Sequence, residues 1–247
     1  MKHILNISCY LFVPLDNLPS LRDRIHLRAQ ELSLLGTVLL AEEGVNVFLA
    51  GPHESVRAMV AWLRQDPLLQ SIEPKESESN IVPFAKLRVK IKREIIRMNH
   101  PTIQPYSQRA PSVSSGTLAR WLRSGVDDEG RPIVMLDTRN AFEVDVGRFR
   151  GAIDWRLNKF SEFTEAVRLH RDEFHGKTVV SYCTGGIRCE KAALFMAKAG
   201  IEKVLQLEGG ILKYFEEVGT EHYEGQCFVF DERSALDPSL QAQNDMN

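Results

Sequence analysis

One segment constrains the fold of this chain more than any other: an apolar run that leads directly into a cysteine and two glycines. Thr178 to Tyr182 is followed by the loop Cys183-Thr184-Gly185-Gly186-Ile187-Arg188. A helical pattern from Arg188 to Lys198 comes next, with apolar side chains at three- and four-residue spacing. A strand, a tight loop and a helix in this order are typical of open α/β sheets, which bind ligands beyond the carboxyl ends of their strands. The sequence therefore predicts a functional site at Cys183.

The residue types in this loop favour a reactive cysteine. Gly185 and Gly186 permit a tight curl whose backbone N–H groups turn inward, and the following helix presents its positive end. Such an arrangement stabilises an anion, so we expect Cys183 to ionise more readily than a free thiol and to be accessible. Arg188 supplies a guanidinium that can face an oxyanion. A buried structural cysteine is the alternative, but it would need neither the curl nor the cation.

The second half of the chain alternates strands with helices, which implies a parallel sheet covered on both faces. A buried strand from Ile133 to Leu136 ends in Asp137-Thr138-Arg139, and a short strand is expected from Val204 to Leu207. Asp137 and Arg139 could buttress the cysteine loop or orient Arg188. A structural ion pair inside the fold is the favoured interpretation of these two charges.

The first half has the order β-α-β-β-α-β, which is the ferredoxin-like arrangement also seen in acylphosphatase-like domains. The expected elements are a strand at 4–13, a helix from Asn17 that Gly36 ends, strands at 38–40 and 45–49, a helix at 54–64 and a last strand at 85–96. Residues 73–80 are treated as a polar connection. The predicted organisation is a ferredoxin-like domain at 1–98, a linker at 99–112, a catalytic domain at 113–225 and a C-terminal extension at 226–247.

A basic stripe marks the last of these strands. Alternate positions are cationic and the positions between them are apolar, so one face of the strand is basic and the other buried. The cationic residues are Lys86, Arg88, Lys90 and Lys92. The stripe could contact nucleic-acid phosphates, or its lysines could protect a sheet edge from pairing with another chain.

Composition excludes several other classes. The formal net charge is -2, so the whole chain is not a polyanion binder. No stretch approaches the roughly 18 apolar residues that span a bilayer, and the N-terminus lacks a signal-peptide pattern. The four cysteines include no Cys-x-x-Cys pair, which argues against a zinc site and a disulfide framework. We expect a cytoplasmic protein with free thiols, no metal and no membrane contact.

The cysteine loop, together with Asp137-Thr138-Arg139, resembles the rhodanese superfamily. Four residues separate Cys183 from Arg188, whereas the phosphatases of this type need five, and position 189 is a cysteine. The resemblance narrows to the rhodanese-domain tRNA uridine hydroxylases, which carry an acylphosphatase-like N-terminal domain with a Glu-Gly-x-Asn signature. The matching segments are Glu43, Gly44 and Asn46, the runs 137–147, 183–192 and 207–211, and Gly225 to Arg233.

The resemblance implies an oxidoreductase that hydroxylates C5 of uridine 34 in the tRNA anticodon loop. Cys183 is the residue on which this activity should depend, molecular oxygen is the co-substrate, and no other cofactor or obligate protein partner is evident. The Cys183 thiolate would add to C6 of the uracil, or would carry oxygen or sulfur as a sulfenate or persulfide. The tRNA substrate favours phosphate contact for the basic stripe.

Two other functions compete with this one. A thiosulfate-type sulfurtransferase would carry a persulfide on Cys183 and would suit the same loop, although it does not require the N-terminal domain. A non-catalytic rhodanese module would not need both Cys183 and Arg188. Cys189 could resolve an oxidised Cys183, but a packing role is favoured because free cysteines are often simply buried. Cys227 is expected in the core or facing a partner.

Overall fold

The computed structural model describes residues 4–242, which form two compact units. The first unit consists of the chain up to Arg97, together with Phe230–Ser234 and the segment from Leu240. The second unit consists of Met98–Val229 and Ala235–Ser239. The end of the chain therefore contributes to both units. Within residues 4–242, no helix is long and apolar enough to cross a membrane.

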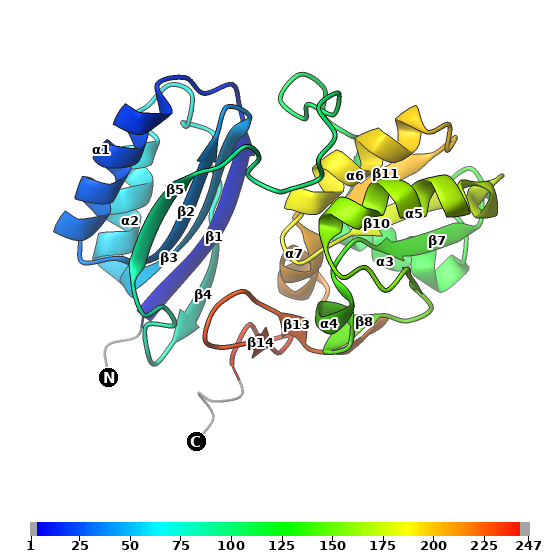
Figure 1. Cartoon of the computed structure of the whole chain (residues 1–247). Coiled ribbons are helices and arrows are strands. Elements are labelled where there is room, and N and C mark those ends of the chain that lie inside the picture. Colours follow the sequence, from blue (N-terminus) through cyan, green and yellow to red (C-terminus); the bar gives the residue numbers. More distant parts are fainter. Residues whose placement is uncertain (1–3, 243–247) are drawn as a thin grey trace. The chain divides into compact units, whose positions relative to one another are not determined.

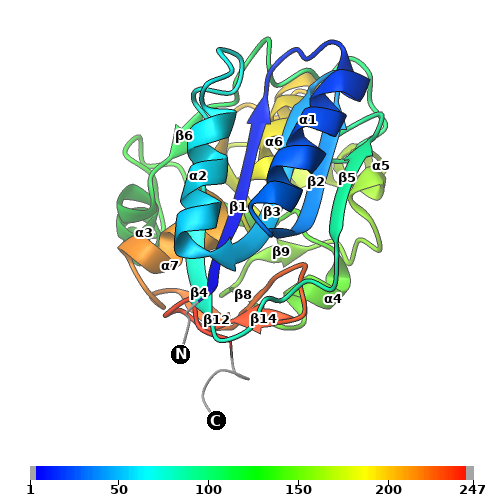
Figure 2. The same cartoon turned by 90° about the vertical axis from the view of Figure 1, so that its left-hand side faces the viewer.

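The first unit is a five-stranded sheet with the order β4-β1-β3-β2-β5. Its strands are β1 (Ile4–Phe12), β2 (Leu35–Ala41), β3 (Gly44–Pro52), β4 (Lys75–Ser79) and β5 (Leu87–Ile91). Helices α1 (Leu18–Glu31) and α2 (His53–Leu63) lie side by side on one face of the sheet (Figure 2). Alternate residues of β1 and β3 point toward these helices, and their apolar side chains form the core with those of α1 and α2. This is the expected ferredoxin-like arrangement with one strand added.

Two expectations for the first unit were wrong. The fourth strand of the ferredoxin-like core is β4, in the segment that was expected to be a polar connection, whereas β5 is an additional edge strand parallel to β2. β4 is almost entirely polar, so hydrophobic periodicity could not reveal it. Gly36 does not end the first helix but lies within β2, at a φ of 138°. A Cβ there would lie 2.0 Å from the carbonyl oxygen of Phe48, so only glycine fits.

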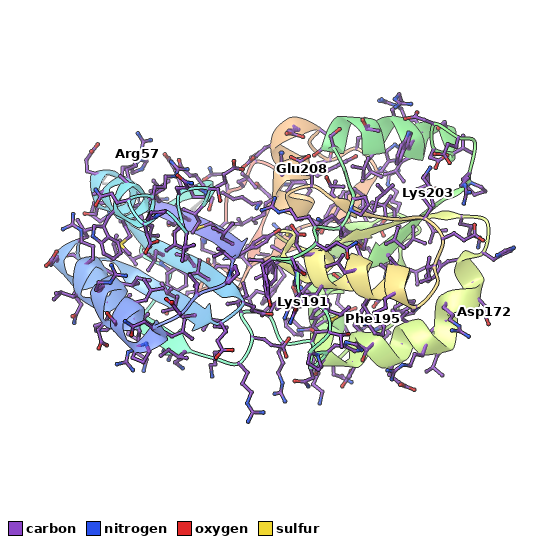
Figure 3. All side chains as sticks on the ribbon, turned by 90° about the horizontal axis from the view of Figure 1, so that it is seen from above. Arg57, Asp172, Lys191, Phe195, Lys203 and Glu208 are labelled. Atoms are coloured by element: carbon purple, nitrogen blue, oxygen red, sulfur yellow. The ribbon has the colours of Figure 1, made fainter. Side chains whose placement is uncertain are left out.

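The second unit has a five-stranded sheet with the order β6-β11-β10-β7-β9, and every neighbouring pair is parallel, as expected. Helices α5 and α6 lie on one face, and α3 and α7 lie on the other (Figures 1 and 3). The helices are α3 (Ser115–Ser124), α4 (Ala141–Val144), α5 (Phe163–His170), α6 (Ile187–Lys198) and α7 (Gly210–Glu217). The strands are β6 (Ser112–Val113), β7 (Ile133–Asp137), β8 (Gly147–Phe149), β9 (Ile153–Asp154), β10 (Thr178–Tyr182), β11 (Val204–Leu207), β12 (Tyr223–Gly225), β13 (Cys227–Phe228) and β14 (Ala235–Leu236).

Strand β10 occupies the centre of this sheet, between β11 and β7. All five of its residues are buried, which explains why the segment is a continuous apolar run with little alternation. Its carboxyl end leads directly into Cys183. The central strand therefore delivers the cysteine loop to the edge of the sheet at which open α/β folds place their ligands.

Candidate active site: a buried thiolate loop

The cysteine loop, residues 183–188, connects β10 to α6. Helix α6 begins at Ile187, and Gly186 precedes it in the left-handed conformation, at a φ of 100°. This backbone conformation strains residues that have a side chain, so glycine is required for the chain to turn from the strand into the helix. The second glycine of the motif thus has a defined structural task, as the sequence predicted.

Helix α7 holds the loop from behind. The N–H groups of Ile211 and Leu212 donate hydrogen bonds to the carbonyl oxygens of Cys183 (3.0 Å) and Thr184 (3.1 Å). Gly210, at a φ of 70°, lies so close to the loop that a Cβ would be 2.5 Å from the carbonyl oxygen of Cys183. Because the carbonyl oxygens of Cys183 and Thr184 point to α7, the N–H groups of the cysteine loop can face the sulfur of Cys183. This contact between Gly210 and the cysteine loop is not predictable from the sequence.

The sulfur of Cys183 lies among hydrogen-bond donors and positive charge. The N–H group of Gly186 donates to Cys183 Sγ at 3.1 Å, and the N–H group of Arg188 and the side chain of Cys189 also donate to it. Burial opposes ionisation of the thiol, but these donors and the charge of Arg188 outweigh it and lower the pKa of Cys183. The expected anion-stabilising environment is therefore present.

The exposure of Cys183 differs from the expectation. Its side chain is 0% exposed, so the sulfur is not accessible to a large substrate in this conformation. Its surroundings are nevertheless polar, because an N–H group contacts the sulfur directly. The open side of the loop is at Gly185, where an added Cβ would meet no atom within 4 Å. A nucleobase can reach the sulfur only if the loop opens.

Arg188 is held by an acidic residue to which the sequence assigned no chemistry. Its two terminal nitrogens donate to the carboxylate oxygens of Glu143 at 2.6 and 2.8 Å, and both side chains are buried. Glu143 Oε2 also accepts the N–H group of Asn140 at 3.0 Å and caps α4. Glu143 therefore caps α4 and is the ion-pair partner of Arg188. The guanidinium thus donates to both carboxylate oxygens of Glu143.

Asp137 and Arg139 form a fully buried ion pair with a closest distance of 2.6 Å. Arg139 also donates to the carbonyl oxygens of Gly147 (2.6 Å) and Glu143 (3.4 Å). Through its bond to the Glu143 carbonyl oxygen, the pair fixes the backbone of the residue that holds Arg188. The Asp137–Arg139 pair therefore supports the cysteine loop indirectly, through Glu143, which is consistent with the structural interpretation of these two charges.

The other two cysteines of this unit also lie at the loop. Cys189 is buried in the first turn of α6, and its side chain hydrogen-bonds to that of Cys183. Burial and the neighbouring Cys183 charge raise the pKa of Cys189. Cys227 is buried in β13, beside Thr184, and burial raises its pKa to about 12. The hydroxyl of Thr184 donates to the carbonyl oxygen of Phe228 at 3.4 Å, so β13 packs against the loop.

The basic stripe has the predicted geometry, although its strand is shorter than expected. Its four cationic residues are exposed, whereas Leu87 and Val89 between them pack against the core of the first unit. β5 is an edge strand whose only partner in the described sheet is β2. The stripe belongs to the first unit and the cysteine loop to the second, so the two candidate sites lie in different units.

The Glu-Gly-x-Asn signature anchors the segment that follows this stripe. The carboxylate of Glu43 accepts the N–H group of Ile95 at 2.8 Å, and the amide of Asn46 donates to the carbonyl oxygen of Ile95 at 3.4 Å. Gly44, at a φ of 146°, leaves no room for a Cβ, which would lie 2.0 Å from the carbonyl oxygen of Leu11. The signature therefore has a structural explanation in this unit: it fixes the chain beyond β5.

Comparison with known proteins agrees with both units. Residues 4–95 match the UPF0176 acylphosphatase like domain, and residues 118–217 match the rhodanese-like domain. The chain is 63% identical to a tRNA uridine(34) hydroxylase of Bordetella petrii over 97% of its own length and 95% of that protein. It is 61% identical to the protein of the same name from Variovorax paradoxus, with 98% and 92% coverage, and 62% identical to that from Bordetella avium, with 96% and 98% coverage. The chain therefore belongs to the tRNA uridine(34) hydroxylase family.

Proposed function

We propose that this chain hydroxylates C5 of uridine 34 in the tRNA anticodon loop, with the thiolate of Cys183 as the reacting group and molecular oxygen as the co-substrate. One observation carries the proposal: a cysteine sulfur that accepts the Gly186 N–H group at 3.1 Å, in a chain 63% identical to a protein named for this reaction. Because tRNA is the substrate, we also place the enzyme in the cytoplasm.

The chemistry of uracil explains why a thiolate suits this reaction. C5 of uracil becomes electron-rich once a nucleophile adds to C6, and a cysteine is a strong nucleophile only as its thiolate. The donors around Cys183 favour that form at neutral pH. Since Cys183 has no exposed surface, binding of the anticodon loop must open the cysteine loop, and the free space beside Gly185 is the side on which the base would enter.

The sulfurtransferase alternative is less favoured. The relatives are named as hydroxylases, and none of those compared above is named as a sulfurtransferase. The site offers a second reason: Arg188 donates its terminal nitrogens to Glu143, so an incoming thiosulfate would have to displace a buried carboxylate. We retain hydroxylation as the single proposed activity.

The basic stripe supports a contact with tRNA phosphates. Its four side chains point away from the core on an exposed edge strand, and no ion pair within residues 4–242 neutralises them. Evenly spaced cations of this kind match the spacing of a nucleic-acid backbone better than isolated surface lysines do. We therefore propose that β5 binds the substrate tRNA while the anticodon reacts in the second unit.

A triple neutralisation tests this contact. Lys86, Arg88 and Lys90 changed together to Gln should reduce the slope of log affinity for tRNA against log salt by about 2, because each phosphate contact contributes about 0.7–0.9. The matched control changes Arg22, Arg24 and Arg57 on α1 and α2 to Gln, which removes the same charge from the helical face of the unit. Equal slopes for the two variants would contradict the proposed contact.

The activity itself is tested in cells that lack this gene. Mass spectrometry of their tRNA nucleosides should recover 5-hydroxyuridine when wild-type protein is supplied, and should not recover it with Cys183→Ala. Growth of the complemented cells under ¹⁸O₂ should label the new hydroxyl oxygen. A covalent complex with tRNA that contains 5-fluorouridine should form with wild type and be absent with Cys183→Ser. Full activity of the Cys183 variants would rule out every form of the proposal.

A further inference from the structure

Cys189 occupies an unusual position for a buried residue. Its side chain and that of Cys183 are both 0% exposed, and both residues bond to Gly186, whose N–H group donates to Cys183 Sγ at 3.1 Å and whose carbonyl oxygen accepts the N–H group of Cys189 at 3.0 Å. The side chain of Cys189 also donates to the Cys183 sulfur. Cys189 Sγ also lies 3.6 Å from Thr138 Oγ1. The Thr138 hydroxyl donates its only proton to the carbonyl oxygen of Tyr182 at 2.9 Å, and the single S–H proton of Cys189 is donated to the Cys183 sulfur. Cys189 is thus a protonated thiol beside a thiolate.

We propose that Cys183 and Cys189 act as a dithiol that supplies two electrons to the hydroxylation, so that each turnover leaves a disulfide between them. This inference rests on the proposed function and deepens it. Reduction of molecular oxygen to one inserted oxygen atom and one water takes four electrons, and oxidation of the uracil C–H bond provides two of them. Two thiols that become a disulfide provide the other two, with two protons.

The individual steps balance. The Cys183 thiolate bonds to C6, and the electron pair released at C5 bonds to oxygen; a proton completes a C5 hydroperoxide. The sulfur of Cys189 takes the outer oxygen atom, which leaves a hydroxyl on C5 and a sulfenic acid on Cys189. Loss of the C5 proton expels Cys183 from C6 and restores the ring double bond. Cys183 then attacks the Cys189 sulfur, and the departing hydroxide takes a proton and becomes water.

The geometry of the loop suits this exchange. The two side chains interact across Gly186, so a disulfide, with an S–S bond of roughly 2 Å, requires only a local shift of the loop. Gly185 and Gly186 lie between them in the chain, and the free space beside Gly185 lets the loop adjust. The disulfide must be reduced before the next turnover, so the enzyme requires an external reductant of the dithiol class.

A single-turnover experiment tests the inference. Full-length protein is reduced, freed of small thiols and mixed with excess unmodified tRNA in air-saturated buffer. We expect one 5-hydroxyuridine per chain, together with loss of two alkylatable thiols that peptide mapping assigns to Cys183 and Cys189. Dithiothreitol should restore continuous turnover. Cys189→Ser retains a hydrogen-bond donor but cannot form the disulfide, and should yield at least about tenfold less product without added thiol. Cys9→Ala, in the core of the first unit, should behave as wild type.

The outcomes separate this inference from the proposed function. Product formed by wild type while both thiols stay reduced, or a full single turnover by Cys189→Ser, would overturn the dithiol. Absence of 5-hydroxyuridine from wild type would instead refute the proposed function. In that case the thiol pair is tested without tRNA, by oxidation of the folded protein with hydrogen peroxide. We expect a disulfide between Cys183 and Cys189. A peptide map that shows Cys183 as a sulfenic or sulfinic acid, with Cys189 unlinked, would overturn the inference.

Discussion

Gly210 offers the sharpest test of how the cysteine loop is held. The structure places it at a φ of 70°, with its missing Cβ 2.5, 2.7 and 2.9 Å from three backbone atoms of the loop, which belong to Cys183, Thr184 and Gly186. None of these atoms is the movable end of a side chain. Gly210→Ala must therefore displace the loop itself. Gly219 is a matched control, since it follows the same helix at a φ of 82° and its Cβ would meet nothing within 4 Å.

The expected magnitudes follow from these distances. A left-handed conformation costs an alanine about 1–2 kcal/mol, and the restricted unfolded chain returns about 0.4–1 kcal/mol, so Gly219→Ala should lose about 1 kcal/mol. Gly210→Ala adds about 1–3 kcal/mol for overpacking, and its total should be about 2–4 kcal/mol. At about 2–4 °C per kcal/mol, Tm should fall by roughly 3 °C in the control and by roughly 6–12 °C in Gly210→Ala.

The loop displacement has a second, chemical consequence. The Gly186 N–H group would move away from Cys183 Sγ, and a hydrogen bond to a charged group contributes about 1.5–3 kcal/mol. Its loss corresponds to roughly one to two pKa units, upward for Cys183. The assay is the rate of Cys183 alkylation by iodoacetamide against pH, quantified by mass spectrometry. Its midpoint reports ionisation and is insensitive to a uniform change in access.

A specific result would refute this explanation of the loop. If Gly210→Ala and Gly219→Ala lower Tm equally and leave the same alkylation midpoint as wild type, α7 does not hold the loop by close backbone contact. A lower Tm with an unchanged midpoint would separate the two claims: the contact would exist, but the Gly186 N–H group would not be what keeps Cys183 ionised.

Three further predictions concern the thiols, an acid-sensitive pair and the signature of the first unit. The rate of Cys183 alkylation, which requires the loop to open, should change little down to well below pH 8, because hydrogen-bond donors lower the pKa of Cys183. Burial raises the pKa of Cys9 to about 12, so Cys9 should react only after unfolding; mass mapping across pH distinguishes the two thiols. Burial disfavours ionisation of Asp127, but its bonds to Lys203, Thr178 and two N–H groups outweigh this effect and lower its pKa. The carboxylate therefore stabilises the folded protein fully above a pH of about 4, and this stabilisation is lost as the pH falls. In urea unfolding, Asp127→Asn should be less stable than wild type at pH 7 and nearly as stable as wild type at low pH. Glu43→Ala should release the N–H group of Ile95, which accelerates its hydrogen exchange without altering the Cys183 midpoint.

The sequence predicted those elements whose apolar periodicity is strong. Val204–Leu207 and Thr178–Tyr182 are strands at the predicted residues, and α6 begins one residue earlier than predicted. Strand β4 (Lys75–Ser79) was not predicted, because it pairs with β1 through backbone hydrogen bonds and its side chains are polar. The sequence also did not identify α3, although Ser114 caps this helix and Gly125 ends it, because neither signal stands out among the nearby polar residues.

The site was predictable only as far as local sequence defines it. The curl, the Gly186 N–H donor and the helix that follows belong to one continuous segment, so the residues alone indicated an ionised sulfur. The Arg188–Glu143 pair joins residues 45 positions apart, and the bond from Ile211 to Cys183 joins α7 to the loop. No periodicity connects such residues. The complete burial of Cys183 likewise follows from the assembled unit and not from its loop.

The charges around the sulfur explain why a neutral substrate suits this loop. Asp137 balances Arg139 and Glu143 balances Arg188, so these four buried groups carry no net charge. The thiolate of Cys183 is stabilised by nearby N–H and S–H donors and by the charge of Arg188, which Glu143 partly offsets. An approaching dianion such as thiosulfate would gain no net attraction from these four groups and would meet the repulsion of the thiolate. A neutral uracil ring meets no such penalty, and it needs only the opening of the loop beside Gly185 to bring C6 to the sulfur.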